Sequence, residues 1–430
     1  MSDTNADTLG RAMHGFAADL YPLCRSITGN GLRETLRRIQ RHIPLDIHEV
    51  PTGTQVFDWT VPNEWNIRDA YVKNAAGQKV IDFTQSSLHV LNYSVPVRAQ
   101  MSLEELRPHL YSLPDQPDWV PYKTSYYKST WGFCLSHRQL ETFRPGQYEV
   151  VIDSSLEPGA LSYGEFYLRG EVPDEILISC HACHPSLCND NLSGIALSTF
   201  LANHLRQRQR RYSYRFLFVP GTIGSITWLA RNEDSVLRIK HGLVVSCVGD
   251  GGPFTYKKSR RGNAEIDHVV EHVLKFKAPG HQLREFSPYG YDERQYCSPG
   301  FNLPVGALSR TPHSEFPQYH TSADDLNFVR PENLAESLEM YSIICEVLEE
   351  NRCYQNQSPK GEPQLGKRGL YRQMGGKTDQ PINEFAMLWV LNQSDGSQSL
   401  LDIAERSGLN FGVISEAAQR LESVGLLKIS

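Results

Sequence analysis

The chain of 430 residues lacks several features that mark whole classes of protein. It has no run of about 18 to 20 apolar residues, the length that spans a bilayer, so no membrane partner is predicted. Residues 1–10 are polar and do not resemble a secretory leader, and a cytoplasmic location is therefore expected. The formal net charge is only -6, and no basic run dominates the sequence. Nucleic acid is not expected as a partner, and a small-molecule or peptide-like substrate is favoured.

Cysteine is present without the pattern of a disulfide framework. The nine cysteines are odd in number, and six of them stand singly in the sequence. The other three, Cys180, Cys183 and Cys188, cluster with His181 and His184. This cluster is compatible with a thiolate-rich structural zinc site, or with an active-site loop in which the thiols are small buried side chains. Since a second C-x-x-C pair is missing, the sequence favours the active-site loop.

Strand-like and helix-like segments alternate between residues 149 and 351. Apolar runs of strand length predict strands at residues 176–179, 215–219, 243–248 and 303–308. Apolar residues at helical spacing predict helices at residues 195–206, 264–276 and 333–350. This alternation predicts an α/β domain with a mainly parallel sheet and helices on both faces. The predicted domain comprises residues 1–50 and 153–352.

Residues 51–152 have a different pattern. Short β-prone segments at residues 56–61, 69–72, 80–83 and 88–93 are separated by turn residues and predict an inserted antiparallel β subdomain. Ser102 and Glu105 have the spacing of a capping box, which predicts a short helix within it. The aromatic-rich segment 121–127 is interpreted as packing for this layer, with the lining of a substrate cleft as the alternative.

The C-terminal part is predicted to be a linker followed by a winged helix-turn-helix. Residues 353–380 are rich in glycine and lack a sustained apolar period, which is typical of a linker. Residues 381–430 show three helical segments and a closing strand. This module carries three basic and six acidic residues, whereas DNA binding needs a basic footprint. A DNA-binding regulator is therefore the weaker alternative, and a protein contact, such as homo-oligomerisation through this domain, is favoured.

Polar residues with metal-binding chemistry follow the strand predicted at residues 176–179. His181 lies at the end of this strand, Asp190 precedes the next helix, and His320 lies far downstream in a turn-rich segment. A hydrolytic zinc ion needs about three such protein ligands and one open position. The sequence therefore predicts a zinc centre at His181, Asp190 and His320. His184 competes with His181 for the metal, and Asp190 taken alone would equally serve as a helix cap.

At these motifs the chain resembles the M28-type zinc aminopeptidases, and more narrowly a bacterial aminopeptidase-like group associated with polysaccharide biosynthesis. The resemblance lies in Trp131–Cys134, Cys183–Ser186, Asn189–Gly194 and Phe316–Asp324. It implies a zinc-exopeptidase-like mixed sheet, a β insertion, a C-terminal winged helix and one or possibly two zinc ions. It also implies an Asp ligand after a late strand, for which Asp250 is the available residue.

One position departs from the resemblance. The narrower group has Pro-Glu-Thr-Ile-Gly-Ser after the next strand, and this chain has Gly221 in place of the glutamate. A general base contributes about 10² to 10⁴ in rate, so its loss bears directly on activity. Glu293 and Glu315 are the candidate substitutes, although either is equally compatible with a solvated loop carboxylate.

The predicted function is a zinc-dependent hydrolase of aminopeptidase type that acts on an amide or peptide-like small substrate. The alternative is a repurposed or catalytically degenerate zinc-binding relative with a non-hydrolytic or scaffold role. Gly221 is the residue that motivates this alternative.

Overall fold

The computed structural model describes residues 3–370 and 381–430. The chain divides into two compact units. The first comprises residues 1–264 and 280–339, and the second comprises residues 265–279 and 340–430. The predicted boundaries at residues 51–152 and 153–352 stay predictions, because this division into units does not follow them.

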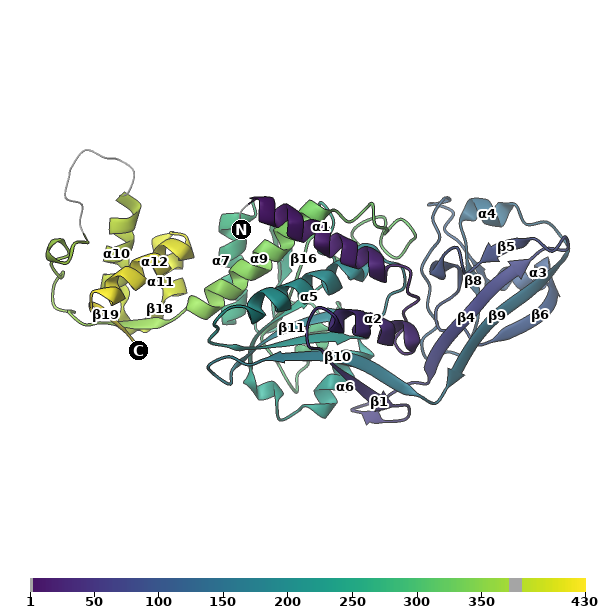
Figure 1. Cartoon of the computed structure of the whole chain (residues 1–430), viewed down its shortest axis with the longest axis horizontal. Helices are drawn as coiled ribbons and strands as arrows, with labels where there is room; N and C mark the ends of the chain where they lie inside the picture. Colours follow the sequence, from purple (N-terminus) through teal and green to yellow (C-terminus); the bar gives the residue numbers. More distant parts are fainter. Residues whose placement is uncertain (1–2, 371–380) are drawn as a thin grey trace. The chain divides into compact units, whose positions relative to one another are not determined.

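An eight-stranded mixed sheet forms the centre of the first unit (Figure 1). Its strand order is β1 (Asp46–Pro51), β10 (Ala160–Leu168), β12 (Ser213–Val219), β11 (Glu175–His181), β13 (Ile239–Val245), β16 (Val305–Ser309), β14 (Thr255–Lys257) and β15 (Gln282–Arg284). Strands β12, β11, β13 and β16 pair in parallel, as do β14 and β15 at one edge. Strand β1 pairs antiparallel with β10, β10 with β12, and β14 with β16. All seven residues of β11 and of β12 are buried, as expected for central strands covered on both faces.

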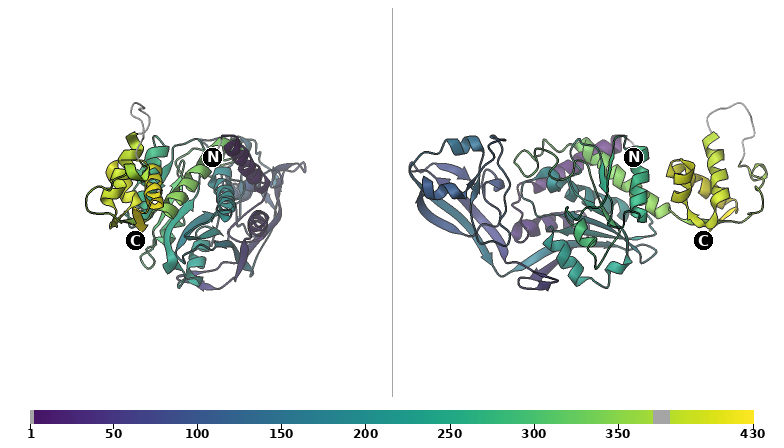
Figure 2. Two further views of the ribbon diagram at one scale, coloured as in Figure 1. Left: turned by 60° about the vertical axis from the view of Figure 1, so that its left-hand side comes forward. Right: turned by 180° about the vertical axis from the view of Figure 1, so that it is seen from behind.

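Helices cover both faces of this sheet, as predicted. Helices α1 (Asp3–Leu20), α2 (Asn30–Gln40) and α5 (Ser193–Arg206) lie on one side, and α6 (Ile223–Arg231) lies on the other (Figures 1 and 2). Helix α5 buries ten of its residues because it is packed between the sheet and α1. Each of the parallel strands β11 and β12 ends immediately before the loop that leads to one of these helices. The carboxyl ends of the two strands therefore bring two loops to one edge, where ligands bind in such sheets.

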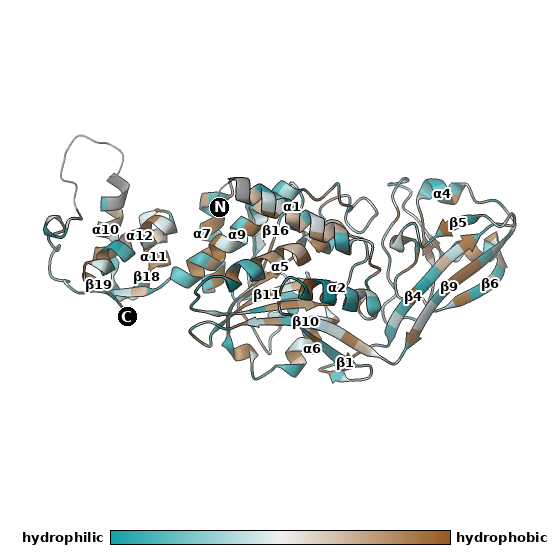
Figure 3. Cartoon of the chain, in the orientation of Figure 1, coloured by the Kyte–Doolittle hydropathy of each residue, from teal (hydrophilic) through white to brown (hydrophobic). Residues whose placement is uncertain are grey.

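Residues 51–152 contribute a second, four-stranded antiparallel sheet to the same unit (Figure 2). Its order is β5 (Lys79–Asp82), β4 (Glu64–Lys73), β9 (Gln147–Glu157) and β6 (Val97–Ser102). Hydrophobic residues gather along β9 and along α5 (Figure 3). The capping box is present: the Ser102 side chain accepts from the Glu105 backbone at the start of α3 (Leu103–Leu106). Small pairs β2–β3 (Gln55–Val56, Trp59–Thr60) and β7–β8 (Leu110–Tyr111, Phe133–Cys134) complete this region.

The strand predicted at residues 88–93 is wrong. The segment is a 3-10 turn at Ser87–His89 followed by isolated bridges. Buried polar side chains here bond to backbone groups outside a strand ladder: Asn92 donates to the Arg25 carbonyl, and His89 contacts the Cys134 carbonyl. These bonds reach across 67 and 45 positions of the sequence and hold the segment in an irregular conformation.

The second unit contains the winged helix. Strands β18 (Asp395–Ser399), β17 (Cys353–Asn356) and β19 (Leu427–Ile429) form its sheet, and the helices are α10 (Pro381–Gln393), α11 (Leu400–Ser407) and α12 (Phe411–Ser423). Helix α7 (Glu265–Lys277) and the end of α9 (Pro331–Glu350) belong to the same unit. Strand β17 lies within the segment that was predicted to be a linker. The Tyr354 side chain of this strand is buried, so the start of the segment packs as part of the sheet. Residues 371–380 of that linker lie outside the described residues.

Candidate metal centre

The loop that follows β11 brings two predicted ligands together. His181 is the last residue of the strand, and Asp190 lies in the turn before α5. Nε2 of His181 is 2.8 Å from Oδ1 of Asp190, and both side chains are almost fully buried. The turn has non-helical backbone angles at Asp190, which separates this carboxylate from the helix that follows. Asp190 therefore faces His181 instead of capping α5.

His320 reaches the same carboxylate from the loop after β16. Its Nε2 lies 3.0 Å from Oδ2 of Asp190, although the two residues are 130 positions apart. Its carbonyl accepts a hydrogen bond from the Tyr122 backbone at 2.7 Å, and its ring stacks on Tyr319 with a centroid distance of 3.9 Å. About a third of the His320 side chain is exposed, which leaves an approach to the centre from solvent.

His184 is the third imidazole at the centre. Its Nδ1 lies 3.9 Å from Oδ2 of Asp190 and is buried without a hydrogen-bond partner. Among the described residues, His181, His184 and Asp190 form a group whose potential ligand atoms all lie within 4.8 Å of one another. Buried polar atoms are rarely left unpaired, so an orphaned nitrogen beside a carboxylate fits a site built for a cation.

The electrostatics of the centre favour ionised Asp190 and neutral His184. Burial opposes ionisation of Asp190, but the attraction of His184, together with the contacts to His181 and His320, holds its pKa well below the ordinary value. Burial lowers the pKa of His184 to about 3, although the charge of Asp190 acts in the opposite direction. A deprotonated carboxylate and a neutral imidazole are the forms that bind metal.

A hydrogen-bond network fixes the turn that carries Asp190. Asp324 accepts from the backbone N–H groups of Asn189 at 2.6 Å and of Asp190 at 3.0 Å. The Asn191 amide donates to the carbonyls of Val245 at 3.0 Å and His181 at 3.2 Å. Asp324 and the two asparagines therefore hold the ligands in place, as outer-shell groups do at metal sites.

Asp250 does not join the group of three. Its Oδ2 accepts from the Asn189 side chain at 2.9 Å, and its Oδ1 accepts from the Thr311 hydroxyl at 2.6 Å and from the Gly252 backbone at 2.7 Å. A carboxylate with so many donors already has its lone pairs in use. Asp250 thus braces the loops around the centre.

The two carboxylates predicted as substitute bases are both engaged in ion pairs. Glu293 is buried, lies 2.6 Å from Nζ of Lys257 and accepts from the Tyr291 backbone. Glu315 is more exposed and forms two contacts with the Arg284 guanidinium, one of them at 2.8 Å. Glu293 directly follows the segment that carries Tyr291, and Glu315 shares the loop after β16 with His320.

Gly221 lies at the carboxyl end of β12, next to the centre. Tyr291 fills the space beside it: a Cβ built on Gly221 would lie 2.1 Å from Cε1 of the Tyr291 ring. The same ring lies 4.2 Å from the His181 ring, centroid to centroid. Sequence reasoning missed Tyr291, because nothing in the order of residues relates positions 221 and 291.

Tyr122 was also missed as an individual residue, although the aromatic-rich segment 121–127 was noted. It is buried, and its ring meets His184 and His320 edge to face at centroid distances of 5.3 and 5.0 Å. Its hydroxyl lies 2.9 Å from that of Tyr126. The segment therefore reaches the centre and does more than pack the β layer.

The cysteines of the loop stay free thiols. Cys180, Cys183 and Cys188 are fully buried, and burial raises the pKa of each thiol. Thiolates are the metal-binding form, so this environment opposes thiolate ligation. The geometry thus agrees with the active-site-loop interpretation of the Cys and His cluster.

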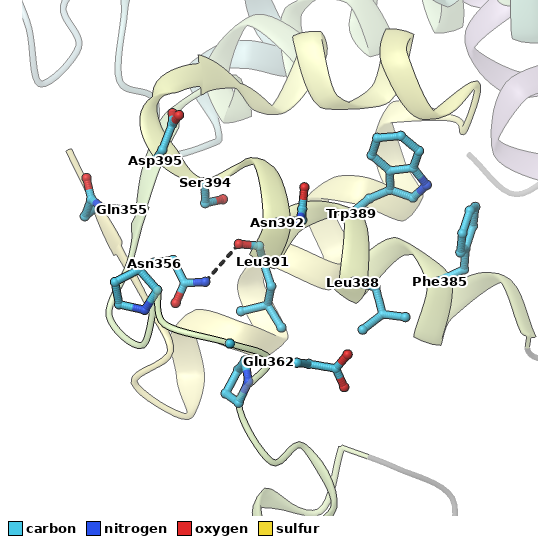
Figure 4. A pocket seen from close by; sticks show the side chains of 13 residues that line it. Gln355, Asn356, Glu362, Phe385, Leu388, Trp389, Leu391, Asn392, Ser394 and Asp395 are labelled. Atoms are coloured by element: carbon cyan, nitrogen blue, oxygen red, sulfur yellow. Dashed lines mark hydrogen bonds between the residues drawn. The ribbon is translucent and has the colours of Figure 1, made fainter.

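A cavity of about 620 Å³ lies in the second unit, away from these residues in the sequence (Figure 4). Phe385, Leu388 and Trp389 of α10 form its apolar side, and Asn356 and Ser394 are among its polar lining. It contains no histidine or cysteine among its described lining residues. The convergence of ligand atoms, and not the volume of a cavity, identifies the metal centre in the first unit as the candidate site.

Comparisons with known proteins agree with this architecture. A protein of Clostridium acetobutylicum named "Putative polysaccharide biosynthesis protein with aminopeptidase-like domain" is 55% identical over 425 residues, which cover 99% of this chain and 98% of the relative. A crystal structure from the same organism, described as a "putative peptidase", superposes with a TM-score of 0.95 at 53% identity, covering 99% of this chain and 98% of that one.

More distant structures share the fold alone. The zinc aminopeptidase BSAP of Bacillus subtilis has a TM-score of 0.56 at 11% identity, covering 79% of this chain and 94% of that one. A peptidase M28 precursor of Shewanella amazonensis has a TM-score of 0.55 at 13% identity, covering 80% and 96%. The predicted aminopeptidase-like α/β fold is thus confirmed. Within the described residues, no helix is long and apolar enough to cross a membrane.

Two family models divide the chain between them. One, described as "Domain of unknown function (DUF4910)", matches residues 14–351, and the other, described as winged helix-turn-helix, matches residues 352–429. The chain therefore belongs to the DUF4910 family and combines an M28 aminopeptidase-like fold with a C-terminal winged helix.

Proposed function

We propose that this protein is a zinc-dependent hydrolase of aminopeptidase type that acts on an amide or peptide-like small substrate. The observation that carries the proposal is the convergence of His181, His184 and His320 on the buried carboxylate of Asp190. Histidine nitrogens and a carboxylate oxygen are the donors of catalytic zinc sites. The fold of zinc aminopeptidases, shared with BSAP, supports the same assignment.

His181, Asp190 and His320 would hold one zinc ion, with His184 beside them. Bound zinc supplies Lewis-acid polarisation of a carbonyl and lowers the pKa of a water molecule to about 7. Asp190 keeps its negative charge in the buried centre, and Asp324 and Asn191 fix the turn that presents it. A second zinc is not proposed, because Asp250 is engaged by other donors and residue 221 has no side chain.

Glu293 is the better supported of the two proposed bases. It is buried on the loop of Tyr291, whereas Glu315 lies at the surface against Arg284. To accept a proton from water, the carboxylate of Glu293 has to loosen its contact with Lys257.

Zinc content tests the proposal. Protein loaded with zinc and freed of excess metal is expected to hold about one ion per chain, by the ligand count of catalytic sites. His320→Ala should lose most of this zinc together with hydrolysis of leucine amide. His137→Ala is the matched control, since His137 lies on the short helix α4 (His137–Glu141) of the β-rich region. Zinc-free wild type after loading, or an unchanged zinc content in His320→Ala, would contradict the proposal.

For the winged helix we propose a protein-contact role, such as homo-oligomerisation. Although this fold class includes many DNA-binding modules, the surface of α12 is not basic. Arg420 is its sole cation, and it lies 2.5 Å from Glu416, while Glu422 is also exposed. Phosphate contacts need unpaired cations, so nucleic acid stays an unexpected partner. Retention of the full chain on DNA at physiological salt would contradict this.

A further inference from the structure

Gly221 and Tyr291 occupy one space between them. A Cβ at position 221 would lie 2.1 Å from Cε1, 2.6 Å from Cζ and 2.8 Å from the hydroxyl oxygen of Tyr291. Real Cβ atoms do not approach other heavy atoms below about 3.0 Å. The aminopeptidase-like group that this chain resembles carries a glutamate at this position. Such a side chain is therefore incompatible with the present position of the Tyr291 ring. The Tyr291 ring occupies the space in which the side chain of that glutamate would begin.

The Tyr291 hydroxyl has only long contacts with the protein. It lies 3.5 Å from the Gly221 carbonyl oxygen and 3.7 Å from Sγ of Cys183. An O–H donor normally approaches an oxygen acceptor to about 2.5–3.0 Å. A tyrosine phenol ordinarily titrates near pH 10, about three units above neutral pH, so it carries its proton. Among the residues that the structure describes, its recorded oxygen acceptor is the distant Gly221 carbonyl.

The ring of Tyr291 lies beside the imidazoles of the centre. Its centroid lies 4.2 Å from that of His181 and 6.0 Å from that of His184. His181, a proposed zinc ligand, and His184 beside it therefore both lie close to the phenol ring, and we expect a substrate carbonyl held at this centre to come within reach of the hydroxyl.

We propose that Tyr291 is a catalytic residue whose hydroxyl donates a hydrogen bond to the carbonyl oxygen of the bound amide. This inference rests on the proposed hydrolase function. When water adds to the carbonyl carbon, the oxygen gains negative charge, and the hydrogen bond from Tyr291 becomes stronger. Tyr291 keeps its proton throughout, so the base that accepts the proton of water is a different group. The chain thus replaces a carboxylate next to the centre by a neutral donor.

Tyr291→Phe tests the hydroxyl while keeping the ring that fills the space beside Gly221. With the zinc-loaded full chain and leucine p-nitroanilide, kcat should fall about 10²- to 10³-fold, the usual effect of removing one oxyanion donor. KM should stay within about twofold, because the hydrogen bond becomes strong only as the carbonyl oxygen gains charge. Zinc content should not change, because Tyr291 is not a proposed zinc ligand. Tyr289→Phe is the matched control, since Tyr289 lies two residues away and is 71% exposed.

A binding measurement separates this inference from the proposed function. The phosphonic acid analogue of leucine carries a tetrahedral, charged group like that of the transition state, and calorimetry should show about 10²-fold weaker binding to Tyr291→Phe. If the wild type binds the analogue in a Tyr291-dependent way but hydrolyses no amide, the proposed function is contradicted. The assignment of Tyr291 as the hydrogen-bond donor then still holds. Equal kcat, or equal analogue affinity, in wild type and Tyr291→Phe would overturn the assignment. Wild type that neither hydrolyses nor binds the analogue would overturn both.

Discussion

The loops that follow β11 and β12 differ in what they offer to the centre between them. The first carries His181, His184 and Asp190, and a network of hydrogen bonds holds His181 and the turn of Asp190. The second carries Gly221, which has no side chain, and the ring of Tyr291 takes up the space. The comparison teaches that the first loop carries residues proposed to bind metal, while the second has an aromatic ring where the resemblance would place a glutamate.

The largest expected effect concerns the first loop. Asp190→Asn removes the charge on which three imidazoles converge, so zinc affinity should fall by more than the roughly 10- to 100-fold typical of outer-shell changes. Competition with a chelator measures it. Asp153→Asn, a surface partner of Arg68, is the control and should bind zinc as the wild type does. Equal affinities would mean that the first loop does not hold the metal.

The next effect tests the network behind that loop. Asn189→Ala removes the amide that donates to Asp250 and accepts from the Gly249 backbone at 2.9 Å. Because the turn before α5 loses this brace, zinc affinity should fall about 10- to 100-fold. The same chelator competition reports the change. An unaltered affinity would show that the ligands are held without the network.

Gly221→Ala tests the second loop. The new methyl group would overlap the Tyr291 ring, and such overpacking costs about 1–3 kcal/mol in the free energy of unfolding. Urea denaturation measures it, with Gly15→Ala as the control because, apart from its own helix backbone, no described heavy atom lies within 4 Å of its Cβ position. In a Tyr291→Ala background the same substitution should cost much less. A harmless Gly221→Ala would mean that Tyr291 moves aside readily.

The smallest effect lies in the second unit, at the buried side chain of His272. Burial lowers the pKa of His272 to about 4, and its Nε2 accepts from the Phe411 backbone. The folded state thus favours the neutral ring, so this stability is complete above about pH 6.5 and is lost as pH falls toward 4. We expect a loss of about 1–2 kcal/mol. Plotted against pH over this range, the urea midpoint of His272→Gln should fall less steeply than that of the wild type. An equally steep fall would contradict the assignment of this stability to His272.

The pattern of residues predicted the parts of the site that depend on strand ends. The apolar run before His181 and the helical spacing after Asp190 were enough to place both at one edge of a sheet, and the segment around His320 completed the prediction. The strands β11, β12, β13 and β16 were predicted for the same reason: buried central strands have continuous apolar runs.

Other features depend on contacts between distant segments. Asp324 braces Asn189 and Asp190 across more than 130 positions, and Tyr291 meets Gly221 across 70. The sequence of strand β10 mixes apolar residues with polar ones and a glycine, and it has no long apolar run. Its place beside β12 was therefore not predicted. Such pairings are decided by three-dimensional packing, on which local periodicity carries no information.

X-ray absorption at the zinc edge of the zinc-loaded full chain tests the central claim most directly. The account predicts a first shell of nitrogen and oxygen atoms at about 2.0–2.2 Å, with scattering from the imidazole rings of His181 and His320. A sulfur shell at about 2.3 Å would mean that Cys180, Cys183 or Cys188 holds the metal, and would contradict the account.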